Sequence, residues 1–294
     1  MPHDKVFYFA FGSNLNKKDW NSGFRPDFDQ CFEKIGVAWL AGHRLAFTRY
    51  SGVRQGGVLD IVRQRGGFVP GAVFRIKNHA GWRALSSKEG GAYKPVWIKV
   101  RLTSGEIVNA FTFQMRDHLF GGTKQRNASF VEPHDAYIAA VRKGLRNHRL
   151  PTRYLEAAIV NKPTPALDAF FCYGTLRSGE CRYGVMESLG ILSEQRGKVR
   201  GRLHDCGSYP AITLDAPQKA RVIGERIRVE NLAEAKRQLD RIEGYDADRK
   251  RDSLYIRKTV SVLLANRENE IAWIYEFNRR LPERVIESGD WFNR

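Results

Sequence analysis

The chain has 294 residues, a length that suits one large domain or two ordinary ones. Its 49 Lys and Arg outnumber its 32 Asp and Glu and give a formal net charge of +17 at pH 7, which attracts anions without identifying a partner. Hydrophobic residues make up 42% of the sequence and aromatic residues 12%, as is typical of folded soluble proteins. No apolar stretch approaches the length of a membrane span, so we expect no membrane contact.

Cysteine and histidine patterns exclude several classes of protein. None of the four cysteines forms a Cys-x-x-Cys pair, and the short apolar run 6–11 is too short for a signal peptide core. We therefore expect free thiols and a cytoplasmic protein. The seven histidines include no HExxH motif or paired metal spacing, and the sequence has no Walker loop or GxGxxG. We expect no cofactor and no metal.

Basic residues are denser in three places than in the rest of the chain. These clusters are Arg142, Lys143, Arg146, Arg149 and Arg153; residues 249–251; and Arg279, Arg280 and Arg284. Such clusters usually form a solvated face. No zinc-finger, helix-turn-helix or RNP-type pattern accompanies them. Contact with nucleic acid or another polyanion is therefore an expectation from charge alone, without support from a motif.

A two-part pattern occurs twice along the chain. An apolar run ends in the loop Gly12-Ser13-Asn14, and Glu89 follows Gly12 after roughly 77 residues. A second apolar run ends in Gly174-Thr175-Leu176, and Glu243 follows Gly174 after roughly 69 residues. Spacings of this size, in the same order, predict two copies of one domain-sized fold.

The predicted elements, in chain order, are mostly strands with a few helices. In the first half we expect strands at 5–11, 58–62, 73–76, 96–102 and 107–113, and helices at 133–148 and 151–160. In the second half we expect strands at 169–173, 198–203, 221–229, 254–264 and 271–277, and a helix capped by Asn231 that runs through Arg241. Strands and helices do not alternate at βαβ spacing, so a doubly wound fold is disfavoured.

These elements predict an α+β chain built from two copies of a small mixed β-barrel domain with flanking helices. The polar stretch 161–168 contains Pro163 and Pro165, which break a helix and favour an extended connector. We therefore expect one domain over 1–160, a linker over 161–168 and a second domain over 169–294.

The repeated loop and glutamate indicate acid–base chemistry. A strand that ends in a Gly-hydroxyl turn can leave backbone N–H groups free to bind a carboxylate or phosphate, although such turns are common in proteins. A glutamate at a helix-to-loop junction in a partly apolar pocket has a raised pKa, which suits a general acid or base. A single exposed glutamate at a helix end would need no such role, but two copies in the same order favour one.

Both halves resemble known families. The first half resembles the γ-glutamylcyclotransferases through Phe11-Gly12-Ser13-Asn14-Leu15 and Glu89-Gly90, supported by Gly56-Gly57-Val58 and Gly71-Ala72-Val73-Phe74. The second half resembles the avirulence-induced-protein-like and γ-glutamylamine cyclotransferase branch. Its matches are Tyr173-Gly174-Thr175-Leu176, Gly201-Arg202-Leu203, Glu243-Gly244-Tyr245 and Ser253-Leu254-Tyr255-Ile256-Arg257.

The resemblance implies a cyclotransferase fold and a ring closure. In that reaction the α-amine of a γ-glutamyl group attacks its own γ-carbonyl, expels the attached amine or amino acid and leaves 5-oxoproline. It implies Glu89 and Glu243 as the catalytic acid/base residues. The substrate-binding residues that it implies in the first copy are Phe11, Gly12, Ser13, Asn14, Leu15 and Tyr93. Those in the second are Tyr173, Gly174, Thr175, Leu176, Tyr245, Tyr255 and Arg257.

The two copies differ, and an alternative function stays open. Phe11 replaces the tyrosine that is usual in the family, so a hydroxyl is lost from the first site. We expect the second site to be active and leave open whether the first is active or only binds. The alternative is a protein that keeps the fold without catalysis and binds a ligand or an anionic partner.

Overall fold

The structure, a computed structural model, describes residues 6–116, 118–120, 123–125, 129–164 and 166–294. The chain forms two compact units, Met1–Ala166 and Leu167–Arg294, and the division between them falls inside the stretch predicted as a linker. Among the described residues, no helix is both long enough and apolar enough to cross a membrane.

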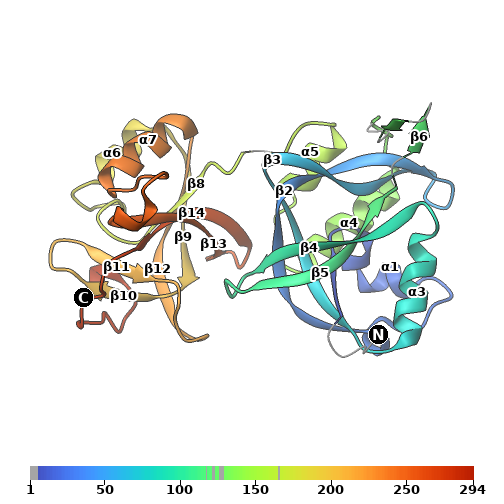
Figure 1. The fold of residues 1–294 in the computed structure, drawn as a ribbon, viewed down its shortest axis with the longest axis horizontal. Helices are drawn as coiled ribbons and strands as arrows, with labels where there is room; N and C mark the ends of the chain where they lie inside the picture. The colour runs from blue at the N-terminus through green and yellow to red at the C-terminus, as the bar shows by residue number, and fades with distance from the viewer. Residues whose placement is uncertain (1–5, 117, 121–122, 126–128, 165) are drawn as a thin grey trace. The chain divides into compact units, whose positions relative to one another are not determined.

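A closed five-stranded barrel forms the centre of the first unit (Figure 1). Its strands are β1 (Phe7–Ala10), β2 (Phe32–Ser51), β3 (Gly56–Ile76), β4 (Tyr93–Leu102) and β5 (Ile107–Met115), in the spatial order β1-β3-β2-β4-β5. The short strand β1 pairs antiparallel with β3 and parallel with β5, and so closes the barrel. A hairpin of β6 (His118–Phe120) and β7 (Thr123–Gln125) follows.

The second unit repeats this topology. Its barrel strands are β8 (Ala169–Cys172), β9 (Ile191–Arg200), β12 (Arg221–Val229), β13 (Tyr255–Leu264) and β14 (Asn269–Phe277), in the order β12-β8-β14-β13-β9. Strand β8 is antiparallel to β12 and parallel to β14, as β1 is to β3 and β5. A hairpin of β10 (Arg202–Asp205) and β11 (Pro210–Thr213) lies between β9 and β12 in the chain. Two mixed barrels with helices confirm the predicted α+β fold class.

A glycine allows a close approach between the first and third strands of each barrel. A Cβ at Gly71 would lie 2.3 Å from the carbonyl oxygen of Ala10, and a Cβ at Gly224 would lie 2.3 Å from that of Cys172. Ala10 and Cys172 are the last residues of β1 and β8, directly before the two Gly loops. The glycines therefore fix the point at which each loop leaves its barrel.

Helices flank both barrels. The first unit has η2 (Ser13–Leu15), α1 (Lys17–Asn21), α2 (Phe28–Cys31), α3 (His79–Glu89), α4 (Asp135–Asn147) and α5 (Arg153–Ile159). The second has α6 (Tyr183–Ser188), α7 (Leu232–Ile242), η3 (Lys250–Asp252) and η4 (Trp291–Asn293).

Helices α3 and α7 occupy equivalent places between the third and fourth barrel strands. Each begins at an asparagine cap: Asn78 accepts a bond from the Gly81 N–H, and Asn231 accepts one from the Glu234 N–H. Each ends beside a glycine with positive φ, at +67° for Gly90 and +59° for Gly244. These ends place a glutamate, Glu89 or Glu243, at the last turn of each helix.

Most predicted elements are present, but the longest hairpin was only partly predicted. The helices at 133–148, at 151–160 and after Asn231 are confirmed as α4, α5 and α7. The 20-residue strand β2 was not predicted, and β3 was predicted as two strands. Register shifts near Gly36 and Gly42 interrupt the alternation of buried and exposed residues along β2, which hides the period of two. The predicted strand at 198–203 spans the break between β9 and β10.

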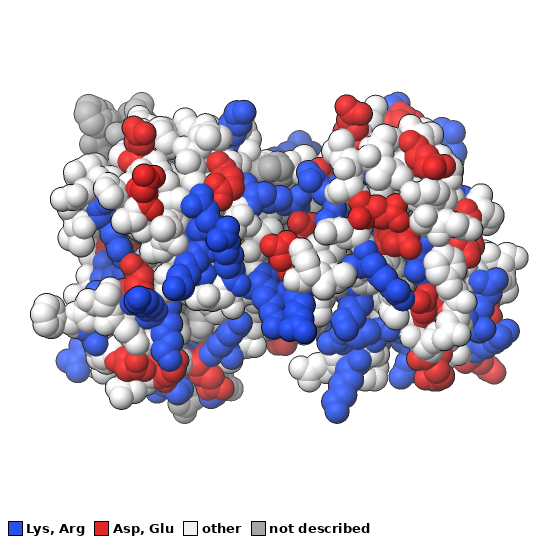
Figure 2. All heavy atoms as spheres, turned by 180° about the vertical axis from the view of Figure 1, so that it is seen from behind, with Lys and Arg blue, Asp and Glu red and all other residues white. Residues whose placement is uncertain are grey.

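Charges of both signs occur on the face of the molecule that Figure 2 shows. Figure 2 shows Asp and Glu side chains interspersed among those of Lys and Arg. Members of the three basic clusters have acidic partners, in the pairs Arg142–Glu156, Arg249–Asp246 and Arg284–Asp205. These pairs partly neutralise the clusters, and contact with a polyanion stays a prediction.

A buried arginine fixes the loop that follows β8. Arg177 is 2% exposed and forms ion pairs with Glu225 and Asp290, at 3.2 Å and 2.5 Å. Glu225 also accepts a bond from the Ser178 N–H. Removal of the guanidinium would leave two mostly buried carboxylates without their main counter-charge.

We expect Arg177→Met to lower the free energy of unfolding of the second unit by about 3 kcal/mol, because breaking a buried ion pair leaves uncompensated charge. Urea unfolding followed by circular dichroism measures the change. The matched control is Arg237→Met, which breaks an exposed pair with Glu234 and should cost less than about 0.5 kcal/mol. Equal shifts in the two variants would contradict a special role for Arg177.

Candidate active sites

A cavity of about 530 Å³ lies in the first unit between the Gly loop, the C-terminal end of α3 and the start of β3. The predicted residues that line it are Phe11, Gly12, Ser13, Asn14, Glu89 and Tyr93. Further lining residues that were not predicted include Tyr8, Asp19, Arg25, Arg49, Arg54, Lys88 and Tyr137. The loop and the glutamate, 75 residues apart in sequence, are thus brought together.

Glu89 accepts a hydrogen bond from the Gly loop in this cavity. The side-chain amide of Asn14 donates to Glu89 Oε1 over 2.7 Å, and it also donates to the Tyr8 hydroxyl over 2.8 Å. Burial raises the pKa of Glu89, while the neighbouring Lys88, the Asn14 bond and Arg49 oppose the rise. Glu89 is therefore a partly desolvated carboxylate with one oxygen already bonded.

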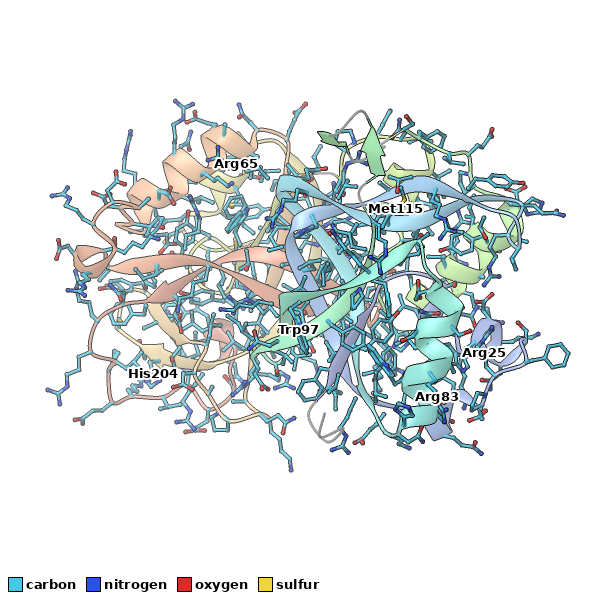
Figure 3. All side chains as sticks on the ribbon, turned by 45° about the vertical axis from the view of Figure 1, so that its right-hand side comes forward. Arg25, Arg65, Arg83, Trp97, Met115 and His204 are labelled. Atoms are coloured by element: carbon cyan, nitrogen blue, oxygen red, sulfur yellow. The ribbon has the colours of Figure 1, made fainter. Side chains whose placement is uncertain are left out.

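Cationic side chains form much of the remaining wall. Arg54 binds both carboxylate oxygens of Asp19, at 2.8 Å and 2.7 Å. Arg25 lies over the Trp20 ring and Arg49 over the Tyr93 ring, and within the described part of the chain neither has a carboxylate partner. Figure 3 shows Arg25 beside the short helices that follow the Gly loop. Arg25 also donates to the backbone carbonyls of Asp19 and Trp20 through Nε and Nη2. The cavity therefore has two positively charged groups that can attract an anion, although the donors of Arg25 are partly used.

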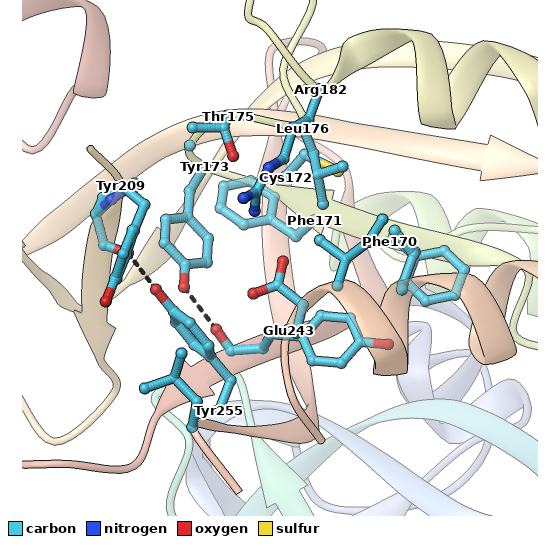
Figure 4. Close-up of a pocket in the computed structure, with 16 residues that line it drawn as sticks. Phe170, Phe171, Cys172, Tyr173, Thr175, Leu176, Arg182, Tyr209, Glu243 and Tyr255 are labelled. Carbon is cyan, nitrogen blue, oxygen red and sulfur yellow. Dashed lines mark hydrogen bonds between the residues drawn. The ribbon is translucent and has the colours of Figure 1, made fainter. Parts of the chain in front are cut away.

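A smaller cavity, about 120 Å³, occupies the equivalent place in the second unit. Figure 4 shows Glu243 facing the Gly loop, with tyrosines on the other sides. The predicted residues that line it are Tyr173, Gly174, Thr175, Leu176, Glu243 and Tyr255. Arg182, Tyr209, Pro210 and Tyr275 also line it and were not predicted as site residues.

Glu243 has a more apolar environment than Glu89. Burial raises its pKa to about 7, and Arg182 is the one charged group that opposes the rise. Leu176 and Ile242 stand where the first site has Asn14 and Lys88. Half of such a group is protonated near neutral pH, which suits a residue that must both take and return a proton.

Tyrosine hydroxyls are used differently in the two cavities. Tyr93 and Tyr255, each the first residue of the fourth barrel strand, donate to the backbone carbonyls of Leu59 (3.2 Å) and Pro210 (2.7 Å) respectively. Tyr173 donates to the Tyr275 carbonyl over 2.7 Å, a bond that Phe11 cannot make in the first site. In the first site a different hydroxyl is present: that of Tyr8, which accepts a hydrogen bond from the Asn14 amide.

Three predicted residues do not line a cavity. Leu15 is buried behind the loop, close to Gly144 of α4. Tyr245 packs against the hydrophobic core of the second unit, and Arg257 lies over its ring. Arg257 also binds Asp240 at 2.5 Å, so its charge is already paired. Their roles in binding stay predictions that the cavity geometry does not favour.

Comparisons with known proteins give the family. The family model described as Gamma-glutamyl cyclotransferase, AIG2-like, matches residues 170–293. A putative γ-glutamylcyclotransferase of Vibrio cholerae serotype O1 is 32% identical over 126 residues, which are 42% of this chain and 95% of that protein. The chain belongs to the AIG2-like γ-glutamyl cyclotransferase family.

Two solved structures are also similar to parts of this chain. One titled γ-glutamyl cyclotransferase is 24% identical, covers 52% of this chain and 85% of its own, and has a TM-score of 0.43. YkqA from Bacillus subtilis is 15% identical, covers 92% of this chain and 83% of its own, and has a TM-score of 0.35. The residues that the family model matches, 170–293, all lie in the second unit.

The raised pKa of Glu243 predicts a pH dependence of stability. Its carboxyl binds a proton more tightly when folded, so stability falls as pH rises from about 4.5 to about 7. We expect this loss to be about 1 to 3 kcal/mol, reduced by partial exposure. Urea unfolding at pH 5 and pH 8 should show a larger loss in the wild type than in Glu243→Gln, in which the raised pKa of Glu89 still contributes. Glu187→Gln, at an exposed position, should keep the wild-type dependence.

Proposed function

We propose that each unit is a γ-glutamyl cyclotransferase site that releases 5-oxoproline and a free amine or amino acid. The observation that carries the proposal is a desolvated glutamate facing a Gly loop at the end of a barrel strand, present in both units. Burial raises the pKa of both glutamates toward the range that proton transfer at neutral pH requires. The match of the γ-glutamyl cyclotransferase family model to the second unit supports the proposal for that site.

The reaction needs one group that moves a proton twice. The glutamate carboxylate takes a proton from the substrate's α-ammonium, and the freed amine nitrogen attacks the γ-carbonyl carbon. The new C–N bond closes the five-membered ring, and the glutamate returns its proton to the leaving nitrogen as the old C–N bond breaks. The ring nitrogen also gives up its second proton, which the released amine binds to become an ammonium, so that the lactam keeps one N–H. The protein is unchanged at the end, and no water is consumed.

The Gly loops supply donors for the substrate. In the described part of the chain, no group accepts a bond from the N–H groups of Ser13 and Asn14, or from those of Thr175 and Leu176. We assign these N–H groups to the α-carboxylate of the substrate, because neighbouring free N–H groups in a turn bind anions. A carboxylate held there would bring the α-amine toward the glutamate and fold the chain for attack.

Loss of either carboxylate should abolish activity at its own site. We expect Glu243→Gln to reduce 5-oxoproline release at the second site by at least about 100-fold, and Glu89→Gln to do the same at the first, because a general base contributes on that scale. The assay measures 5-oxoproline from γ-glutamyl amino acids, γ-glutamyl-lysine isopeptide and glutathione. Glu106→Gln and Glu187→Gln, both at exposed positions, are the matched controls.

Turnover that persists in the double variant Glu89→Gln/Glu243→Gln would overturn the proposal. The absence of turnover by the wild type on every compound, with measurable binding, would favour the ligand-binding alternative instead. Loss in one single variant only would identify which unit acts on that substrate.

Two cations of the first cavity that have no carboxylate partner among the described residues favour an anionic leaving group. Arg25 and Arg49 line the cavity without carboxylate partners among the described residues, whereas the second cavity has Arg182 alone. A carboxylate on the leaving amine can therefore bind in the first cavity through a charge-assisted hydrogen bond. We assign γ-glutamyl amino acids to the first site rather than simple γ-glutamyl amines.

This assignment predicts a selective effect on KM. In a Glu243→Gln background, Arg25→Met or Arg49→Met should raise KM for a γ-glutamyl amino acid about tenfold, since a hydrogen bond between charged groups is worth about 1.5 to 3 kcal/mol. KM for γ-glutamyl-butylamine, which lacks the second carboxylate, should change less than about twofold. Equal changes for both substrates would contradict the assignment.

A further inference from the structure

The Asn14 amide lies between two charged groups of opposite sign. Its nitrogen donates to Glu89 Oε1, and its oxygen accepts a hydrogen bond from the Lys88 ammonium. Lys88 and Glu89 are consecutive residues at the end of α3, and Asn14 lies in the Gly loop. One side chain of the loop is thus held at both ends by the last turn of the helix.

The charges of these partners allow only one orientation of the amide. An ammonium group is a donor without acceptor capacity, and a carboxylate is an acceptor without a donor. If the amide rotated by 180°, two donors would face each other at Lys88 and two acceptors at Glu89. The ammonium therefore keeps the amide nitrogen directed at Glu89.

Other contacts hold Lys88 in place. Its ammonium lies 3.4 Å from Asp19 Oδ2 and 5.4 Å from the centre of the Trp20 ring. Asp19 is in turn held by Arg54. The ammonium is mostly buried, at 12% side-chain exposure, so its geometry is set by these partners rather than by solvent.

We propose that Lys88 is a positioning residue of the first site, which fixes the Asn14 amide so that Asn14 occupies one oxygen of Glu89 and the other oxygen carries the proton. The inference rests on the proposed function of this site. Because Asn14 donates to Oε1 in both protonation states of Glu89, the proton taken from the substrate is placed on Oε2. Proton transfer in the reaction then goes through one atom, Oε2 of Glu89, whose position relative to the substrate is fixed.

The second site has no counterpart of this device. Ile242 precedes Glu243, and Leu176 stands where the first loop has Asn14, so neither the ammonium nor the amide is present. No hydrogen bond to the Glu243 carboxylate is found among the described residues. The same chain therefore provides an internal comparison for the first site.

The charged groups around Glu89 indicate in which direction its pKa should shift when Lys88 is replaced. The titratable and charged groups that face Glu89 or Lys88 are Tyr8, Asp19, Arg25, Arg49, Arg54, Tyr93 and Tyr137. Lys88 is the charged group that most lowers the pKa of Glu89. Burial lowers the pKa of Lys88 itself to about 8, so its ammonium persists at neutral pH.

The test follows the pH profile of kcat/KM in a Glu243→Gln background, so that the first site alone contributes. We expect Lys88→Met to move the acidic limb upward by about one pH unit, since a nearby charge shifts a carboxyl pKa by that order. Lys88→Arg keeps a charged donor and should restore the limb. Lys77→Met, which removes an exposed lysine bonded to a backbone carbonyl, should leave the limb unchanged.

A readout that does not depend on turnover keeps the two proposals separate. In full-length labelled protein, the ¹³C carboxyl signal of Glu89, identified by its loss in Glu89→Gln, should titrate at higher pH in Lys88→Met than in the wild type. Equal titration in both would overturn the role of Lys88, as would an unmoved acidic limb. If no substrate releases 5-oxoproline while the Glu89 titration moves, the proposed reaction fails at this site but the control of Glu89 by Lys88 stands.

Discussion

Removal of one carboxylate from water, at the end of a helix packed on a barrel, is the constraint on which both sites depend. The helix must end at the glutamate, so a glycine with positive φ follows it in each unit. The helix must also lie against the barrel, and Leu85 and Leu239 are fully buried to hold it there. The facing wall is the Gly loop, whose exit point is set by the contact of Gly71 or Gly224 with the preceding strand.

The two units meet this constraint with different chemistry. In the first, polar groups surround the carboxylate: an amide bonds to it and a lysine lies next to it. In the second, aliphatic and aromatic side chains surround it, and one arginine opposes the effect of burial. A shared backbone arrangement thus supports two electrostatic environments, because the residues at the positions of Asn14 and Lys88 are free to change without altering the barrel.

The sequence predicted the parts of the fold that are periodic and the parts of the sites that are repeated. Helix α7, with its Asn231 cap and apolar face, and the two loop–glutamate pairs were recognisable for this reason. Strand β2 was not, since its bulges break the alternation. The cations of the first cavity, such as Arg49 and Arg54, come from the β2–β3 hairpin and have no partner pattern in sequence. Only the fold brings them next to Glu89.

What the sequence did not predict is contacts between residues. Lys88 and Asn14 each belong to a recognisable motif, but their contact joins positions 74 residues apart and depends on the barrel being closed. The family resemblance implied Arg257 as a binding residue, yet Asp240 already pairs with its guanidinium and also accepts a hydrogen bond from the Tyr275 hydroxyl. Sequence motifs therefore indicated which loops form the sites. Which side chains remain available to a ligand depends on the ion pairs, and these are seen only in the structure.

The difference in cavity size has a consequence for selectivity. The second cavity has less than a quarter of the volume of the first and is lined mainly by side chains that surround Glu243. A cavity of that size has room for the end of a molecule and would leave the remainder in solvent. Under the proposed function, such a site would discriminate by the terminus of its substrate and not by the size of what the terminus is attached to, whether a small amine or a protein side chain. Under the same proposal, the first cavity, with room for both ends of a small substrate, would contact the whole molecule.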